Sequence, residues 1–244
     1  MYPESFAGRG FFEAAGLEVL PIELEIDHAI NNLKSWMKPV FTKLPAVAAP
    51  SMSEIRYEPL GVVLIIAPFN YPIYLALGPL LGAIAGGNCA VLKPSELTKH
   101  SEKLLEKLVP QYLDTDFFKV ISGGIATTTS LLNLKWDKIF FTGSTRVGKV
   151  VLQAAVKNMT PVALELGGKS PVIIDQSVTD MALVAKRVMW GKLINAGQVC
   201  CYPQTHYENL TSCPNRLIQP PIIVINPSTD MHRPRLCAVP FIEV

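Results

Sequence analysis

The segment KIFFTGSTRVGK, residues 138–149, decides the fold prediction for this chain. Its first five residues, Lys138–Thr142, form an apolar run that predicts a buried strand. Gly143 and Gly148 mark the turn that follows, and a helix is predicted over Arg146–Lys157. A strand, a glycine-rich turn and a helix in this order are typical of α/β proteins.

The glycine-rich turn is also a candidate phosphate-binding site. Glycines at such a junction let backbone N–H groups approach an anion, and the N-terminus of the following helix favours negative charge. The turn is not a complete P-loop, because Val150 stands where that motif needs Ser or Thr to hold magnesium. It also lacks the usual three-glycine dinucleotide fingerprint. A glycine-rich turn without a ligand therefore stays an alternative.

Strands and helices alternate on both sides of this segment. The predicted strands are Gly61–Ala67, Cys89–Leu92, Phe117–Ile121, Val162–Leu166 and Val172–Ile174. The predicted helices are Pro21–Met37, an apolar helix up to about Gly86, Ser101–Leu113, Thr127–Leu134 and Asp180–Asn195, with a Pro/Ala-rich connector over Lys43–Ser53. Apolar strands without alternation are buried on both faces, so we predict an α/β fold with a Rossmann-like, mostly parallel sheet and helices on both faces. Such sheets bind ligands at the carboxyl ends of their strands.

Composition narrows the class of protein. Hydrophobic residues make up 49% of the 244 residues and charged residues 17%, which permits a sizeable core. The net charge of +2, without a basic block, gives no reason to expect a nucleic-acid partner. Five cysteines, two of them adjacent, do not suggest a disulfide framework, and no secretory signal is visible, so we predict a cytoplasmic location. The four histidines show no metal-ligand spacing, and no metal is predicted.

The almost continuous apolar stretch from Leu60 to Leu92 raises the alternative of a membrane span. Three prolines and the Gly86–Gly87 pair interrupt it. A buried strand, a turn and a buried helix fit this pattern better than a single long helix.

Candidate catalytic residues lie next to the ends of the predicted elements. Cys200, in NAGQVC, is a candidate thiolate nucleophile at a tight turn, or else an inert core cysteine. Glu165 ends an apolar strand and could act as a general base if it is partly buried, or form an ordinary surface salt bridge. Asn70 could donate its amide to an oxyanion, or serve as a turn residue. Lys93 and Glu96 could hold ribose hydroxyls or form a charged turn.

Together these segments resemble the aldehyde dehydrogenase superfamily. APFNYP, LKPSE, FTGSTRVGK, LELGGKSP and NAGQVC occur in the order and approximate spacing of that family, over roughly residues 21–201. The longer segments YEPLGVVLIIAPFNYPI, LVPQYLD and TPVALELGGKSP are most similar to its class 3 branch, the fatty and aromatic aldehyde dehydrogenases. The resemblance implies the aldehyde dehydrogenase fold, in an incomplete form.

The resemblance also implies an activity, the NAD(P)-dependent oxidation of an aldehyde to a carboxylic acid. It assigns Cys200 as the nucleophile, Asn70 as an oxyanion donor together with the Cys200 N–H, and Glu165 as the base for thioester hydrolysis. Lys93 and Glu96 are expected at the adenosine ribose of NAD or NADP, where Glu96 would repel a 2′-phosphate and Lys93 could offset that repulsion. The pyrophosphate is expected at the glycine-rich turn, formed by Gly143, Ser144, Thr145, Arg146, Val147 and Gly148.

The chain departs from the family pattern at both ends. We expect an unmatched segment (1–20), an NAD(P)-binding domain (21–168), the start of a catalytic domain (169–201) and an unmatched, irregular tail (202–244) in which Ile222–Ile225 is strand-like. Family members continue into a full catalytic domain and form homodimers, and some attach to membranes through a C-terminal segment. The chain as written is therefore expected to be catalytically impaired. A nucleotide-binding form without turnover is the alternative, and a P-loop-like nucleotide hydrolase is a third reading.

Overall fold

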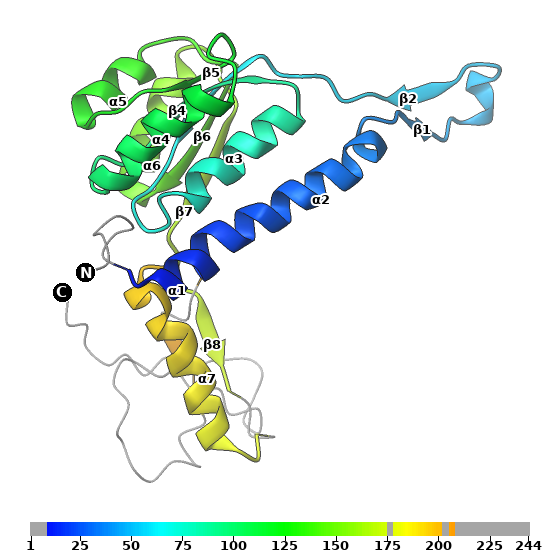
Figure 1. Cartoon of the computed structure of the whole chain (residues 1–244). Helices are drawn as coiled ribbons and strands as arrows, with labels where there is room; N and C mark the ends of the chain where they lie inside the picture. Colours follow the sequence, from blue (N-terminus) through cyan, green and yellow to red (C-terminus); the bar gives the residue numbers. More distant parts are fainter. Residues whose placement is uncertain (1–8, 175–177, 202–204, 208–244) are drawn as a thin grey trace. The chain divides into compact units, whose positions relative to one another are not determined.

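The computed structural model describes residues 9–174, 178–201 and 205–207. The chain divides into two compact units, the first up to Leu166 and the second from Gly167 onward. The larger, first unit contains a five-stranded sheet with helices around it (Figure 1). This sheet positions most of the predicted site residues.

All neighbouring strands of the five-stranded sheet are parallel. Its strands are β3 (Val62–Ile66), β4 (Cys89–Lys93), β5 (Phe118–Val120), β6 (Lys138–Gly143) and β7 (Val162–Leu166). They lie in the order β5-β4-β3-β6-β7, and every pair is parallel, so all carboxyl ends lie at one edge. The chain moves outward from β3 to β5 and then returns to the other side of β3 at β6. Open α/β sheets bind ligands at such a reversal of strand order.

Helices cover both faces of this sheet. They are α3 (Tyr74–Ala85), α4 (Lys99–Tyr112), α5 (Ile125–Leu132) and α6 (Thr145–Val156). Residues of α3 and α4 share one buried cluster with the sheet, and residues of α5 and α6 share the other. The prediction of an α/β fold with a parallel sheet and helices on both faces is confirmed, with bounds within a few residues of those predicted.

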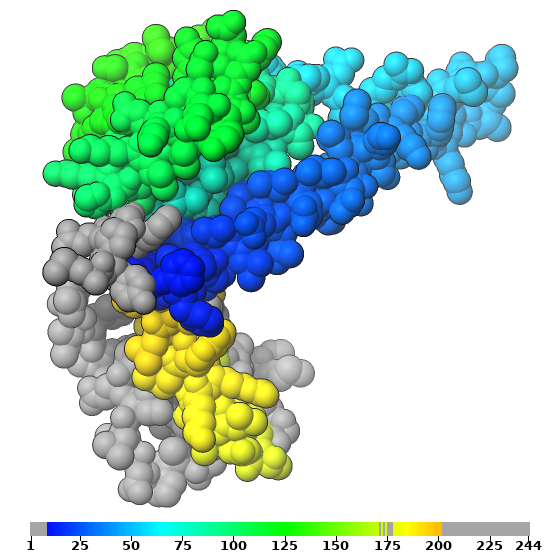
Figure 2. Space-filling view, viewed as in Figure 1, coloured from blue at the N-terminus to red at the C-terminus, as the bar shows by residue number. Residues whose placement is uncertain are grey.

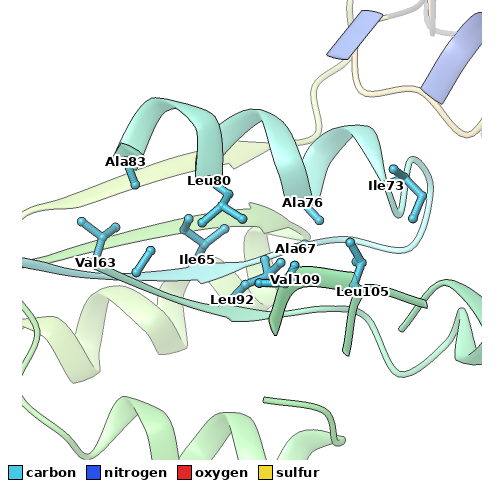
Figure 3. Close-up of a cluster of buried hydrophobic side chains, with 11 residues drawn as sticks. Val63, Ile65, Ala67, Ile73, Ala76, Leu80, Ala83, Leu92, Leu105 and Val109 are labelled. Atoms are coloured by element: carbon cyan, nitrogen blue, oxygen red, sulfur yellow. The ribbon is translucent and has the colours of Figure 1, made fainter. Parts of the chain in front are cut away.

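The two clusters explain why the strands are apolar without alternation. Ile65 of β3 packs with Leu80 of α3 and Leu105 of α4 on one face (Figure 3). Its neighbour Leu64 belongs to the opposite cluster, together with Val151 of α6. Consecutive side chains of a strand point to opposite faces, and both leucine and isoleucine here are 0% exposed. Burial on both faces is what the continuous apolar run predicts.

The N-terminal helix is longer than the sequence predicts. α1 (Phe11–Ala14), a π-helical turn η1 (Ala15–Val19) and α2 (Leu20–Trp36) follow one another without a break. The predicted helix Pro21–Met37 is confirmed as α2 within one residue at each end, but α1 and η1 before it were not predicted. A proline normally marks a helix start, but this one follows a π-helical turn, where the regular bonding pattern is already interrupted. The surface of α2 lies against that of α3 (Figure 2).

The predicted connector Lys43–Ser53 forms the loop of a small hairpin between α2 and the sheet, and the hairpin itself was not predicted. β1 (Val40–Thr42) pairs antiparallel with β2 (Ser53–Ile55), and a short 3-10 turn η2 (Ala46–Ala48) lies between them. All three residues of β1 are exposed. A strand without a buried face leaves no apolar alternation in the sequence, which is why the hairpin was missed.

The described residues of the second unit form one long helix and a pair of short strands. Its elements are β8 (Pro171–Ile173), α7 (Met181–Leu193), a 3-10 turn η3 (Ile194–Gly197) and β9 (Thr205–Tyr207). β8 and β9 pair in parallel. β9 lies in the segment that was expected to be irregular, so that expectation was wrong for these three residues. The other run predicted in that segment, Ile222–Ile225, lies outside the described residues.

The apolar stretch from Leu60 to Leu92 forms β3, a turn, α3 and most of β4, as predicted. Within the described ranges, no helix has both the length and the apolar character needed to cross a membrane.

Candidate functional site

The candidate site follows the carboxyl edge of the five-stranded sheet. One row of paired residues crosses four strands of the sheet near this edge. It consists of Lys93 on β4, Ile66 on β3, Phe141 on β6 and Leu164 on β7. Glu165 comes one residue after this row on β7. The register therefore brings Lys93 and Glu165, which lie far apart in the sequence, to the same edge.

The glycine-rich turn connects β6 to α6, as predicted. Ser144 is the N-cap of α6, and its hydroxyl accepts a hydrogen bond of 3.3 Å from the Val147 N–H. Ser144, Thr145 and Arg146 are exposed. The first turn of a helix carries N–H groups without partners inside the helix, together with a partial positive charge. This exposed first turn is therefore accessible to an anion.

Both glycines of the turn are surrounded by side chains. A Cβ atom on Gly143 would lie 2.6 Å from Cζ of Phe141. A Cβ atom on Gly148 would lie 2.9 Å from Cδ2 of Leu166. Packing against Phe141 of the same strand and against Leu166 of β7 therefore gives a reason for glycine at both positions, besides any approach of a phosphate.

Lys93 and Glu96 form an ion pair where β4 ends. The Lys93 ammonium donates a hydrogen bond of 2.6 Å to the Glu96 carboxylate. The lysine side chain is 3% exposed and the glutamate 39%. Burial acts to raise the pKa of Glu96, but the hydrogen bond from Lys93, a backbone hydrogen bond and the lysine charge outweigh it and hold the pKa below its usual value. The pair thus presents an ionised carboxylate at the sheet edge.

The loop after β5 reaches the same edge, although its residues were not predicted as part of the site. A Cβ atom on Gly124 would lie 3.9 Å from Cγ of Glu96. The Gly123 N–H donates a hydrogen bond of 2.9 Å to the Glu102 carboxylate. The Ser122 hydroxyl is buried and has no hydrogen-bond partner among the residues that the structure describes. The signal in the sequence was the glycine pair directly after a strand.

Asn70 lies in the loop between β3 and α3 and is half-buried. Arg9 donates a hydrogen bond from its guanidinium to the Asn70 carbonyl. The Glu18 carboxylate accepts hydrogen bonds from the N–H groups of Ile73 and Tyr74, at 3.0 and 2.9 Å. Arg9 and Glu18 were missed because they lie in the segment 1–20, where the sequence shows no clear pattern.

Glu165 has an exposed side chain. The partial burial that would favour a general base is therefore absent in this structure, which fits the alternative of a surface carboxylate. β7 is the last strand of the sheet and has a neighbour only on the β6 side among the described residues. An edge strand leaves one flank uncovered. The role of Glu165 as a general base stays a prediction.

Cys200 lies in the second unit, directly after a left-handed turn. Asn195, Ala196 and Gly197 have φ values of 53°, 53° and 77°. Two hydrogen bonds from side chains hold this turn. The side-chain amide of Asn195 donates to the Gln198 backbone carbonyl at 3.2 Å, and the side-chain amide of Gln198 donates to the Asn195 backbone carbonyl at 3.3 Å. A positive φ at a residue other than glycine costs about 1 kcal/mol or more, so the turn is strained. The predicted tight turn is confirmed, and Cys200 is exposed rather than part of a core.

A family model described as "Aldehyde dehydrogenase family" matches residues 13–208 of the chain. The chain belongs to the aldehyde dehydrogenase family. This confirms the resemblance read from the motifs. The match begins before Pro21 and ends after Cys201, so it is wider than the range over which the motifs of the family were recognised.

Curated aldehyde dehydrogenases of family 3 are among the similar proteins. The mouse family 3 member B2 is 52% identical over 198 residues, which cover 80% of this chain and 41% of the mouse protein. The family 3 comG protein of Dictyostelium discoideum is 52% identical over 194 residues, which cover 79% of this chain and 41% of that protein. The prediction of the class 3 branch is confirmed. The chain spans about two fifths of the length of these relatives.

Solved aldehyde dehydrogenases share the fold. The substrate-bound AldH of Staphylococcus aureus has a TM-score of 0.77 and 44% identity, over 82% of this chain and 43% of that one. The succinic semialdehyde dehydrogenase of Streptococcus pyogenes, in complex with NADP+, has a TM-score of 0.73, over 83% of this chain and 44% of that one. At 23% identity the second likeness concerns the fold alone.

Proposed function

We propose that this chain carries the cofactor-binding part and the nucleophile loop of an NAD(P)-dependent aldehyde dehydrogenase, which oxidises an aldehyde to a carboxylic acid. One observation carries the proposal: the Asn70 loop, the Lys93–Glu96 pair, the exposed first turn of α6 and Glu165 all lie at one edge of the parallel sheet. Membership of the family and relatives named as aldehyde dehydrogenases support it.

The residues at this edge fit a dinucleotide. The first turn of α6 would hold the pyrophosphate through its N–H groups. The ionised Glu96 would accept hydrogen bonds from ribose hydroxyls. The unpartnered hydroxyl of Ser122, in the same loop, is a further polar group that a ligand would satisfy. When bound, NAD or NADP supplies the acceptor for the two electrons that leave the aldehyde.

The residues of the chain then have distinct tasks. The Cys200 thiolate attacks the aldehyde carbon, and the oxygen that becomes negative accepts hydrogen bonds from the Asn70 amide and the Cys200 N–H. Oxidation leaves the acyl group on the Cys200 sulfur as a thioester. Glu165 takes a proton from a water molecule, whose oxygen attacks the thioester carbon. The carbon–sulfur bond breaks, the carboxylic acid leaves, and the thiolate is restored.

Trapping of the thioester tests this proposal. The purified chain is incubated with hexanal and NAD, quenched in acid, digested and examined by mass spectrometry. We expect the acyl group on the peptide that contains Cys200, none in Cys200→Ser, and more in Glu165→Gln, because hydrolysis is slowed. Cys201→Ser is the matched control and should keep the adduct. An acyl group that persists in Cys200→Ser would refute the assignment of the nucleophile.

A nucleotide-binding form without turnover is the second candidate. The groups that fit the dinucleotide all lie in the first unit, whereas Cys200 lies in the second. Protection by NAD against thermal unfolding, without acylation of Cys200, would favour this candidate. The cytoplasmic location stays a prediction, and the homodimer stays an expectation for full-length members of the family.

A further inference from the structure

Glu18 is a buried carboxylate to which the mechanism above gives no task. It belongs to the π-helical turn η1 and is 0% exposed. Glutamate is almost never fully buried unless it is paired. Burial raises the pKa of Glu18, although hydrogen bonds from the Tyr74 and Ile73 N–H groups and the charge of Arg9 act in the opposite direction. Burying a carboxylate costs free energy, so the buried position of Glu18 calls for a structural reason.

The first reason is the start of α3. Ile73, the N-cap residue of this helix, makes no capping hydrogen bond with its own side chain. Glu18 supplies the cap instead, by accepting from the N–H groups of Ile73 and Tyr74 at 3.0 and 2.9 Å. A carboxylate at a helix N-terminus satisfies these N–H groups and interacts favourably with the helix dipole. The loop that contains Asn70 therefore ends at a point held by a distant side chain.

The second reason is Arg9, which joins Glu18 to the loop itself. One guanidinium nitrogen of Arg9 lies 2.5 Å from the Glu18 carboxylate, and another donates to the Asn70 carbonyl. The guanidinium also lies over the ring of Tyr71, 4.9 Å from its centre. The loop is thus held at Asn70, at Tyr71 and at the start of α3 by one buried pair of charges.

The π-helical turn is the device that places Glu18. π-turns insert into α-helices mostly as single turns and are frequent at functional sites, because the extra residue changes the direction of the side chains. Glu25, further along the same helix, also reaches α3, but its carboxylate accepts from the Tyr74 hydroxyl at 2.6 Å and is exposed. The two carboxylates therefore contact the same helix, and only Glu18 contacts the backbone next to the Asn70 loop.

We propose that Glu18, assisted by Arg9, is a positioning residue that holds the Asn70 loop, and with it the Asn70 amide, in one conformation as an oxyanion donor. This inference rests on the proposed function, in which Asn70 is the oxyanion donor. Donors of this kind act by being held in place before charge develops, so a loop that moves loses much of their effect. Glu18 itself touches neither substrate nor cofactor in this scheme.

The first experiment measures amide hydrogen exchange in the full chain. Glu18→Gln should raise the exchange rates of the Ile73 and Tyr74 amides by about tenfold, the factor that matches the loss of one charge-assisted hydrogen bond. Glu25→Gln is the matched control and should leave both rates unchanged within about twofold. Equal rates in wild type and Glu18→Gln would overturn the inference, whatever the activity of the chain.

The second experiment measures acylation of Cys200 by p-nitrophenyl acetate, which needs no cofactor. The thiolate attacks the ester carbonyl, an oxyanion forms, and p-nitrophenolate leaves as the thioester forms. Glu18→Gln should slow this burst about tenfold in the wild-type background and less than about twofold in the Asn70→Ala background, because the two residues act through one donor. A merely structural role would slow both backgrounds equally, and that result would contradict the proposal.

Two results would require a different comparison: failure of Glu18→Gln to fold, and absence of acylation in the wild type. If Glu18→Gln does not fold, Arg9→Met takes its place, since it removes the donor to the Asn70 carbonyl and leaves the cap of α3 intact. Arg9→Met should then slow the acylation burst more in the wild-type background than in the Asn70→Ala background. If wild type shows no acylation of Cys200, the proposed function fails, and hydrogen exchange alone decides whether Glu18 holds the loop.

Discussion

Lys93 donates a hydrogen bond of 2.6 Å to Glu96 three residues later, and this lysine is 3% exposed. The sequence segment LKPSE contains both residues, but the depth at which the ammonium is buried is visible only in the folded chain. A buried charge depends strongly on its partner. If the proposed cofactor binds here, the pair would link the stability of the sheet edge to that binding.

Because of this ion pair, the free energy of unfolding should depend on pH in the acidic range. The pKa of Glu96 is lowered from 4.5 in the folded chain, so the unfolded chain binds the proton more readily. The stabilisation by Glu96 is therefore complete above pH 4.5 and is lost as the pH falls through the folded-state value. Urea unfolding of wild type and Glu96→Gln across this range tests it: the difference in unfolding free energy should shrink as the pH falls. A constant difference would contradict the prediction.

Glu96→Gln should also change the choice of cofactor. The carboxylate accepts from ribose hydroxyls and repels a 2′-phosphate, so the variant should bind NAD about tenfold more weakly, the loss expected for one hydrogen bond to a charged group. NADP should lose less affinity, or gain some. Calorimetric titration with both nucleotides measures the ratio. Glu106→Gln is a suitable control, because Glu106 is an exposed residue of α4 and lies outside the residues assigned to the cofactor.

Two substitutions at Ser144 separate its two roles. Ser144→Ala removes the cap of α6 and should cost about 1 kcal/mol in the free energy of unfolding. Ser144→Asp keeps a capping oxygen and should retain most of that stability. Its negative charge would lie where the pyrophosphate is expected, so NAD affinity should fall at least about tenfold. Unchanged NAD affinity in Ser144→Asp would argue against a phosphate site at this turn.

Gly143→Ala should destabilise the chain by about 1–3 kcal/mol, because the new methyl group would overlap the buried ring of Phe141. Gly82→Ala is the matched control. Gly82 is an exposed helix residue with no neighbour within 4 Å of an added Cβ atom, so the change should stabilise by up to about 1 kcal/mol. Thermal unfolding of both variants checks the opposite signs. A stabilised Gly143→Ala would show that the ring does not limit this position.

Elements with a buried face could be predicted from the sequence, and elements without one could not. β3 and β6 were predicted because their side chains are buried on both faces, which leaves an unbroken apolar run. β1 has no buried residue and was missed. The start of α2 was predicted within one residue from Pro21, whereas the helical turns α1 and η1 before this proline were missed.

The candidate site was predictable where its residues follow a strand directly. Asn70, Lys93 and Gly143 were found in this way, because the carboxyl ends of parallel strands converge at one edge. The exposure of Glu165 was not predictable, since it depends on β7 being the last strand of the sheet. No local pattern could have indicated that Arg9 and Glu18 reach the Asn70 loop.

The sequence by itself determined the order of strands and helices, the family, and the candidate residues Cys200, Glu165 and Asn70, because each depends on local periodicity or on short motifs. Only the tertiary structure decided which partners these residues receive. Glu18 and Ile73 lie 55 positions apart, and their hydrogen bond exists because α2 packs against α3. Contacts of this kind come from the packing of distant segments, whose geometry no single stretch of sequence specifies.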